Sequence, residues 1–191
     1  MLCSAAIAAL AGGCSFGSSS SVTNYDLTAP RGTPAGGGGI GQLAVAEPVA
    51  VQPLETDRII VKDASGAVSS LGGGQWADRL PRLVQARLIQ TFENSSRIKA
   101  SRPGERVTPD YQLNTEIRAF HVQAVTSEAV VEISVKVVDD RNGRIVIARV
   151  FSGREAIAAI DAQNAAQALD RALSGVLTGI VRWVGTGRAS S

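Results

Sequence analysis

The stretch VVEISVKVV, residues 130–138, decides how the folded part of this 191-residue chain is organised. Its apolar residues Val131, Ile133, Val135 and Val137 alternate with polar ones. Because successive side chains of a β-strand point to opposite faces, this period of two predicts a strand with one buried face. The second face is wet or covered by a partner.

Two further strands are predicted beside this one. Residues 111–119 alternate in the same way, within a strand that we expect to run to residue 123. Residues 145–151 follow the turn formers Asp140-Arg141-Asn142-Gly143, and Asn-Gly is a strong signal for a tight hairpin. The three segments together predict an antiparallel meander.

The first half of the folded part also has a β pattern. Alternate apolar residues over 40–51 predict a strand that two prolines bend. Residues 57–62 form a strand core between charges, and residues 67–71 are expected to return from the turn at 63–66 as a hairpin. The glycines at 72–74 are then expected to end this sheet segment.

A first amphipathic helix is predicted from the change of period at Trp76, because apolar residues from Trp76 to Phe92 fall on one helical face. Pro81 is tolerated only within the first turn of a helix, so Asp78 is the expected N-cap and Trp76 is expected just ahead of the helix. Gln85 is placed outside the apolar face.

A second, longer helix is predicted after Asp161, a favourable N-cap, and its wide apolar stripe continues to Val184. Three charged residues interrupt this stripe, so the helix is not a predicted membrane span. Gly175 and Gly179 allow another backbone to approach closely. We expect them to serve packing on the domain's own sheet rather than a dimer interface.

These elements predict an α/β (α+β) fold with a single domain, residues 40–186. The expected architecture is a mixed or antiparallel sheet with a central helix and a long C-terminal amphipathic helix packed on it. The chain is 45% hydrophobic but only 4% aromatic, so the core must consist of Val, Ile, Leu and Ala. Residues 187–191 are expected to form a disordered tail.

The N-terminus resembles a bacterial lipoprotein signal. Residues 1–13 contain an apolar run of the length of a signal peptide and lead to Cys14 through small residues, with Leu10 one place earlier than in the usual lipobox. We predict that Cys14 becomes the lipidated first residue of the mature chain; the alternative is an unmodified leader cysteine. Because no basic residue precedes the apolar run, the true start is expected upstream of Met1. Ser15, in place of Asp, favours the outer membrane.

The segment that follows the cysteine is predicted to be a tether. Residues 14–39 are rich in Ser and Gly, which are too polar or flexible to pack. A short alternating piece near residues 24–28 is expected to be an edge strand that Pro30 terminates.

Neither the charge of the chain nor its polar residues indicate nucleic-acid binding or catalysis. The formal charge is only +2 and the basic residues are scattered, so nucleic acid is not an expected partner. Asp139 and Asp140 fit the chemistry of a hairpin turn. His121 has no second His or free Cys as a metal partner and no obvious nucleophile. We therefore expect no catalytic residue, no metal and no cofactor; an envelope hydrolase using these three residues is the weaker alternative.

Several loose motifs occur in an order that resembles the ABC-type transport auxiliary lipoproteins, the paraquat-inducible protein C-like family. The most telling is a Trp-Ala-Asp-Arg-Leu run that opens a helix after a glycine-rich turn. The motifs are the lipobox-like cysteine, Tyr25-Asp26-Leu27 followed by Pro30, Asp57-Arg58-Ile59-Ile60-Val61, Gln75-Trp76-Ala77-Asp78-Arg79-Leu80, and Asp110-Tyr111-Gln112-Leu113.

This resemblance implies an α/β domain anchored at the periplasmic face of the outer membrane. It also implies work with a mammalian-cell-entry (MCE) domain protein and an inner-membrane ABC permease and ATPase, which move lipids or other apolar compounds across the envelope. Among the motif residues, Tyr25, Trp76 and Leu80 are expected to contact a partner or to serve the structure. Several copies on one partner, as a homo-oligomer, would be compatible with this role.

A second function remains open at the sequence level. A stand-alone periplasmic lipoprotein that itself binds a lipid and maintains the envelope would need an apolar cavity between the sheet and the helices. The two functions therefore differ in what they require of the interior.

Overall fold

The computed structural model describes residues 22–32, 41–95 and 98–186, which form one mixed sheet and two helices. In chain order the elements are β1 (Thr23–Tyr25), β2 (Gln42–Val45), β3 (Val49–Ala50), β4 (Arg58–Lys62), β5 (Val68–Trp76), α1 (Leu80–Asn94), β6 (Lys99–Ser101), β7 (Tyr111–Gln123), β8 (Glu128–Asp139), β9 (Ile145–Ala156) and α2 (Ala162–Thr186).

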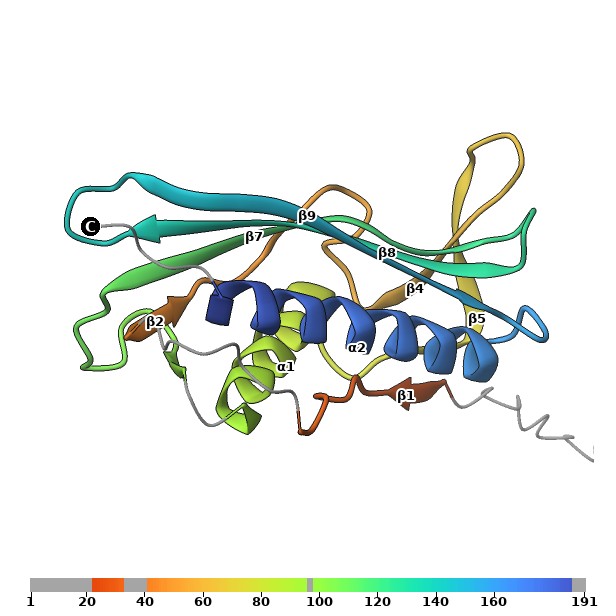
Figure 1. Cartoon of the computed structure of the whole chain (residues 1–191). Helices are drawn as coiled ribbons and strands as arrows, with labels where there is room; N and C mark the ends of the chain where they lie inside the picture. Colours follow the sequence, from red (N-terminus) through yellow and green to blue (C-terminus); the bar gives the residue numbers. More distant parts are fainter. Residues whose placement is uncertain (1–21, 33–40, 96–97, 187–191) are drawn as a thin grey trace, which may run out of the picture.

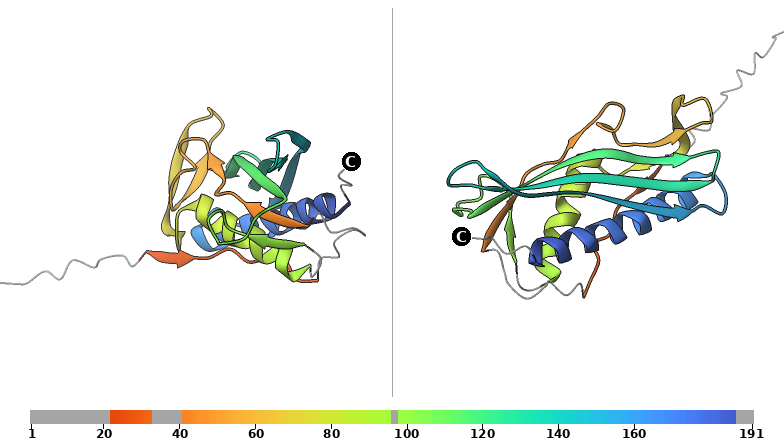
Figure 2. Two further views of the ribbon diagram at one scale, coloured as in Figure 1. Left: turned by 90° about the vertical axis from the view of Figure 1, so that its left-hand side faces the viewer. Right: turned by 45° about the horizontal axis from the view of Figure 1, so that its top comes forward.

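The molecule has two layers. The sheet forms one layer, and both helices lie against the same face of it, with α2 running along the long strands and α1 crossing behind it (Figure 1). The two views of Figure 2 show the same arrangement, with the other face of the sheet left uncovered by helices. The predicted α+β domain with a mixed sheet and a C-terminal helix is therefore confirmed.

Strand β7 is the axis of the sheet. Strand β8 pairs antiparallel with it along its whole length, from Tyr111↔Asp139 to Gln123↔Glu128. Three short strands share its other edge, because β2, β3 and β4 each pair with it in parallel at successive positions. Beyond them the sheet continues through β5 to β1 and through β2 to β6, while β9 closes the opposite side as an edge strand.

The predicted meander of β7, β8 and β9 is confirmed, and so is its buried face. The apolar residues of β8, from Ala129 to Val137 at alternate positions, are at most 2% exposed. On the opposite face Ser134 is also buried, because Glu116 of β7 and Val150 of β9 flank it in register. The turn between β8 and β9 has Gly143 at φ 69°, as an Asn-Gly turn requires.

The C-terminal helix is confirmed with its cap. The Oδ1 of Asp161 accepts a hydrogen bond of 2.8 Å from the Asn164 backbone N–H, and this bond is the first cause of the lowered pKa of Asp161. The helix runs for 25 residues, and its apolar stripe packs on β8 and β9. No helix among residues 22–32, 41–95 and 98–186 is both long and apolar enough to cross a membrane.

The expectation that the glycines at 72–74 end the sheet segment is wrong. Strand β5 continues through them to Trp76, and the register with β4 jumps from Ile60↔Ser70 to Arg58↔Gln75. The glycines form the wide side of this bulge, with Gly73 at φ 84°. Extra residues without side chains therefore bend the strand and do not terminate it. The hairpin from the turn at 63–66 is confirmed, since the Asp63 carboxylate accepts hydrogen bonds from Ser65 and Ala67.

Two expectations for α1 are also wrong. The N-cap is Arg79, which makes no side-chain capping bond, while the Asp78 carboxylate accepts the Arg79 N–H at 2.7 Å. Gln85 is buried at 8% exposure, and its amide donates to the Val45 carbonyl at 3.0 Å. The helix packs against α2 on one side and against β2 and β6 on the other, so more than one of its faces is covered.

Candidate functional site

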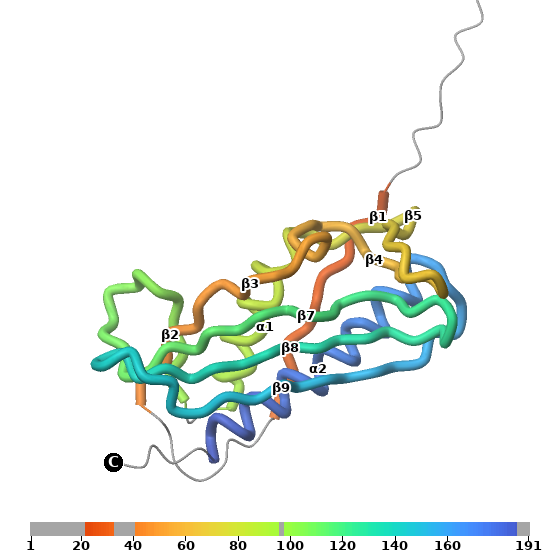
Figure 3. Tube along the Cα trace, turned by 90° about the horizontal axis from the view of Figure 1, so that it is seen from above, coloured from red at the N-terminus to blue at the C-terminus, as the bar shows by residue number. Residues whose placement is uncertain are grey.

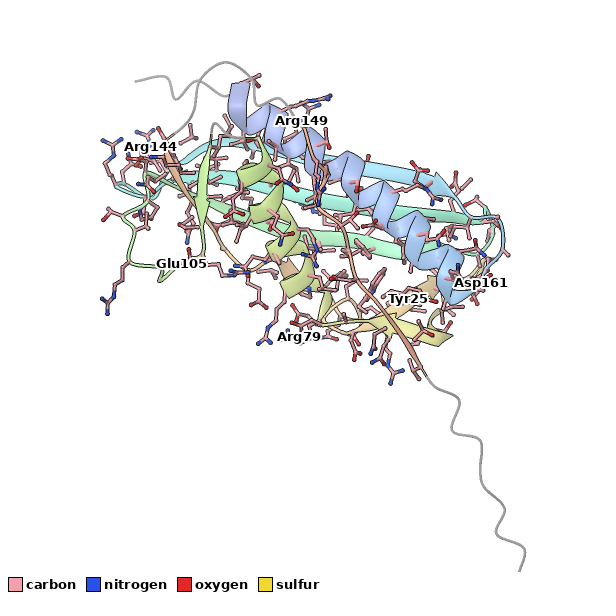
Figure 4. The ribbon with its side chains drawn as sticks, turned by 90° about the horizontal axis from the view of Figure 1, so that it is seen from below. Tyr25, Arg79, Glu105, Arg144, Arg149 and Asp161 are labelled. Carbon is pink, nitrogen blue, oxygen red and sulfur yellow. The ribbon has the colours of Figure 1, made fainter. Side chains whose placement is uncertain are left out.

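The residues that lead from the predicted tether onto the fold form a strap, which we define as residues 22–32. Its strand β1 joins the edge of the sheet by pairing in parallel with β5, with Tyr25 beside Trp76. The strand predicted near residues 24–28 is thus present at 23–25 and ends before Pro30. The strap then crosses the helices on the side away from the sheet (Figures 1 and 4).

Specific bonds fasten the strap to both helices. Asp170 of α2 accepts two hydrogen bonds of 2.7 Å from Thr28, one from its backbone N–H and one from its hydroxyl. Asp26 pairs with Arg87 of α1 at 2.6 Å, and Leu27 is 2% exposed between these contacts. A force that pulls on the chain before residue 22 would therefore be transmitted through the strap to the sheet and to both helices.

Two of the three predicted motif residues lie in the core. Trp76 is 1% exposed and meets Phe120 edge to face, with ring centroids 5.7 Å apart. Leu80 is 2% exposed, and its backbone N–H donates to the Thr56 carbonyl at 3.0 Å. Side chains this deeply buried stabilise the fold and have no surface to offer a partner.

Tyr25, the third motif residue, is half-buried at the same corner. A Cβ on Gly74 would lie 2.5 Å from its ring and 2.8 Å from Ala162, so only glycine leaves room for the tyrosine. The Tyr25 carbonyl accepts the Ala77 N–H at 2.7 Å. The motif therefore joins the strap, the end of β5 and the start of α2 at one corner, near the labels Tyr25 and Asp161 in Figure 4. The predicted lipidation site, Cys14, lies outside the described residues.

The structure does not bring the catalytic candidates together. His121 lies opposite Val130, whereas Asp139 lies opposite Tyr111 at the far end of the same pair of strands. Burial, followed by the positive charge of Lys62, lowers the pKa of His121.

The Asp139 carboxylate serves the β8–β9 turn, whereas the backbone of Asp140 bonds to the residue before β7. The Asp139 carboxylate accepts the Arg141 N–H at 2.9 Å, and the Asp140 N–H donates to the Asp110 carbonyl at 3.1 Å. Within the part of the chain that the structure describes, no three His, Cys, Asp or Glu side chains gather as a metal site.

The structure has a groove between β9 and α2 that was not predicted from the sequence. It has a volume of about 430 Å³ and lies between the sheet edge and the C-terminal half of the helix. The sequence signal was present, because Arg182 and Trp183 follow Gly175 by seven and eight residues and so share its helix face. The meander strand that supplies the other wall cannot be read from that spacing. The lining residues are Arg149, Phe151, Ser152, Gly175, Val176, Gly179, Arg182, Trp183 and Thr186.

Comparison with known families gives one match over most of the chain. A family model described as "ABC-type transport auxiliary lipoprotein component" matches residues 25–181. The uncharacterized protein bll6063 of Bradyrhizobium diazoefficiens is 35% identical over 165 residues, which cover 83% of this chain and 44% of that protein. The chain thus spans less than half the length of this curated relative.

Solved structures share the fold. The crystal structure of protein XCC0632 from Xanthomonas campestris has a TM-score of 0.71 and 25% identity, over 85% of this chain and 91% of that chain. A crystal structure of an uncharacterized protein has a TM-score of 0.69 at 14% identity, over 85% of this chain and 98% of the other. The family model matches from residue 25 onward, so the match includes most of the strap. This is consistent with the structure, where the strap is bonded to α2 through Thr28 and is part of the folded domain.

Proposed function

Because the chain belongs to the family of ABC-type transport auxiliary lipoprotein components, we propose that it is the outer-membrane-anchored docking subunit of an MCE-type ABC transport system. In this role it moves no substrate and hydrolyses no ATP. It holds a partner of the transport system at the periplasmic face of the outer membrane, so that lipids or other apolar compounds pass between the membranes.

The lipobox-like sequence supports the anchor. Each buried methylene contributes about 0.8 kcal/mol, so the several acyl chains of a bacterial lipoprotein hold a protein stably where a single chain does not. Residues 14–21 then link Cys14 to the strap, and the strap is fastened to α1 and α2 by Arg87 and Asp170. A lipid at Cys14 would therefore hold the domain by the β1 edge and leave the opposite edge, β9, free for a partner.

The arrangement of polar residues supports a binding role over catalysis. His121 lies opposite Val130, far along the strand pair from Asp139, and the Asp139 carboxylate is occupied by the hairpin turn. The family's description is that of a transport component. We therefore propose no enzymatic activity for the chain.

The interior favours docking over the alternative of a stand-alone lipid-binding lipoprotein. Such a protein needs an apolar cavity between sheet and helices. Among the described residues that space is filled by one packed cluster. Its members Phe92, Val131, Leu173 and Leu177 are fully buried, each at 0% exposure. The groove at β9 is open and lies outside this cluster.

Co-purification tests the proposal. The full-length lipoprotein, tagged at its C-terminus and extracted from native membranes in mild detergent, is expected to recover an MCE-domain protein and the ABC permease. Its matched control is the Cys14→Ser form, which is expected to recover them poorly because it is not held at the same membrane. Recovery of no transport subunit by the parent protein would contradict the proposal.

A further inference from the structure

We infer that the groove between β9 and the C-terminal half of α2 binds an extended acidic segment of a partner protein, which adds a strand to the free edge of β9. The inference deepens the proposed function and rests on it for the source of the segment. Its own basis is the geometry and charge of this groove.

Strand β9 offers a long edge to such a segment. It has 12 residues and pairs only with β8 among the described strands, so one side of its backbone has no strand partner. It contains no proline, and the bulge in its pairing lies at one end, between Val137 and Val138 of β8. Free edges of this length are templates for an added strand unless they are protected.

Small residues of α2 leave space beside the β9 edge for an added strand. Figure 3 shows α2 passing beneath β9, and Gly153 permits this close approach. Farther along the helix a Cβ on Gly175 would meet no described atom within 4 Å, whereas one on Gly179 would lie 3.3 Å from the Phe151 ring. Glycine inside a helix costs about 0.5–1 kcal/mol relative to alanine. Among the described residues, no neighbouring atom explains why position 175 is a glycine.

Aromatic side chains flank this floor. Phe151 of β9 and Trp183 of α2 meet edge to face, with ring centroids 5.5 Å apart, and both are partly exposed. An apolar side chain of an added strand would lie over Gly175 between β9 and the helix. The groove therefore offers one apolar position, in addition to the backbone edge.

Charge selects the chemistry of the occupant. Near the other end of β9 the arginines are paired: Arg154 of β9 with Glu128 at 3.3 Å, and Arg171 of α2 with Glu155 at 3.7 Å. Arg149 and Arg182, which line the groove, make no ion pair with any described carboxylate. The Arg149 guanidinium lies 5.1 Å from the Phe151 ring centroid, which keeps it beside the groove (Figure 4).

An acidic strand satisfies both arginines and the backbone edge at once. Carboxylates spaced along an extended chain would pair with Arg149 and Arg182, and main-chain hydrogen bonds to β9 would supply the rest of the affinity. An anionic lipid could meet the arginines, but it could not use the strand edge. Its acyl chain would also find no continuation, because Val176 at the floor is 3% exposed and belongs to the packed core.

Two groove variants test the inference in the native co-purification. Arg149→Glu with Arg182→Glu reverses the charge, and Gly175→Leu fills the floor from a position where an added Cβ meets no described atom within 4 Å. Each is expected to reduce recovery of the transport subunit about tenfold, the effect of roughly 1.4 kcal/mol of binding free energy. Thermal unfolding and circular dichroism of the purified variants establish that the fold is retained.

Matched controls carry the same changes elsewhere. Arg102→Glu with Arg106→Glu reverses two charges in the loop before β7, and Gln167→Leu adds a leucine to an exposed position of α2. Both are expected to recover the partner as the parent does. If the parent recovers the partner and the groove variants recover it equally well, the inference is wrong while the proposed function stands.

A photocrosslinker at Ser152 identifies the occupant directly, whether or not co-purification succeeds. The full-length lipoprotein carrying benzoylphenylalanine at this position is irradiated in cells, and the crosslinked peptide is sequenced by mass spectrometry. The expected product is an acidic segment of another protein, and it is expected to disappear with Arg149→Glu and Arg182→Glu. A crosslink to lipid, to a second copy of this chain, or to nothing would overturn the inference.

Discussion

Gly153 of β9 and Ala172 of α2 bring the sheet edge and the C-terminal helix into backbone contact. A Cβ on Gly153 would lie 2.6 Å from the Ala172 carbonyl oxygen and 3.2 Å from a methyl of Val176. The close approach fixes how far α2 lies beneath β9, and it therefore shapes the groove farther along the helix.

This contact predicts that Gly153→Ala lowers the free energy of unfolding by about 2 kcal/mol, because a backbone oxygen cannot move aside as a flexible side chain can. The measurement is urea unfolding followed by circular dichroism. Gly175→Ala is the matched control, since its added Cβ meets no described atom within 4 Å and the change removes a helical glycine. It is expected to raise stability by about 0.5–1 kcal/mol. Equal effects of the two substitutions would contradict the packing described here.

The buried hydroxyl of Thr115 is the basis of a second prediction, a substitution that raises stability. The hydroxyl is buried on the core face of β7 and has no hydrogen-bond partner among the described residues, and Thr115 is 6% exposed. Thr115→Val replaces the hydroxyl by a methyl of similar size and is expected to raise the free energy of unfolding by about 1 kcal/mol.

The matched comparison for this substitution is Thr91→Val in α1. The Thr91 hydroxyl is also buried, but it donates to the Arg87 carbonyl at 2.6 Å. Its replacement is therefore expected to give no gain or a loss of about 1 kcal/mol. A gain at Thr91 as large as that at Thr115 would show that the unsatisfied hydroxyl is not the cause.

The lowered pKa of His121 leads us to expect that the free energy of unfolding depends on pH. Burial and the nearby charges of Lys62 and Arg154 lower its pKa in the folded state from 6.5, so the unfolded chain binds a proton more readily. Stability contributed by the neutral imidazole is complete above 6.5 and is lost as the pH falls through the lower folded-state pKa. Denaturation midpoints at about pH 7.5 and about pH 5 measure the loss. His121→Gln is expected to reduce that difference, and an unchanged difference would contradict this assignment.

Loss of the Asp170 carboxylate is expected to release the strap from α2. Asp170→Ala removes both bonds to Thr28, so residues 28–32 are expected to become sensitive to limited proteolysis while the sheet stays folded. Asp161→Ala is the control: it removes the N-cap of the same helix and costs about 1 kcal/mol, but it leaves the Thr28 bonds in place. Cleavage of both variants to the same extent at the strap would indicate a general loss of stability.

The local elements were predictable because their signals are local. Alternation in residues 130–138, the Asn142-Gly143 turn and the cap at Asp161 each depend on neighbours in sequence, and each is present in the structure. The bulge at the glycines of β5 was not predictable in this way. Glycines mark a break in regular backbone, but whether the strand ends or resumes depends on its pairing with β4.

The long-range relationships were not predictable from pattern. Thr28 and Asp170 are 142 positions apart, and β2, β3 and β4 find their places along β7 through parallel pairings that alternation does not encode. The groove depends on such a relationship as well. Arg149 and Arg182 face the same hollow only because β9 and α2 pack antiparallel to each other at the sheet edge.

Fractionation of the Cys14→Ser form tests the membrane anchor, the central claim of this account, most directly. In the native host the parent protein is expected in the outer-membrane band of a sucrose gradient, and mass spectrometry is expected to show acyl chains on its N-terminal residue. Cys3→Ser, which changes a cysteine of the predicted signal peptide, is expected to behave as the parent, whereas Cys14→Ser is expected to leave the outer membrane. A Cys14→Ser protein that matures and fractionates with the outer membrane as the parent does would contradict the account.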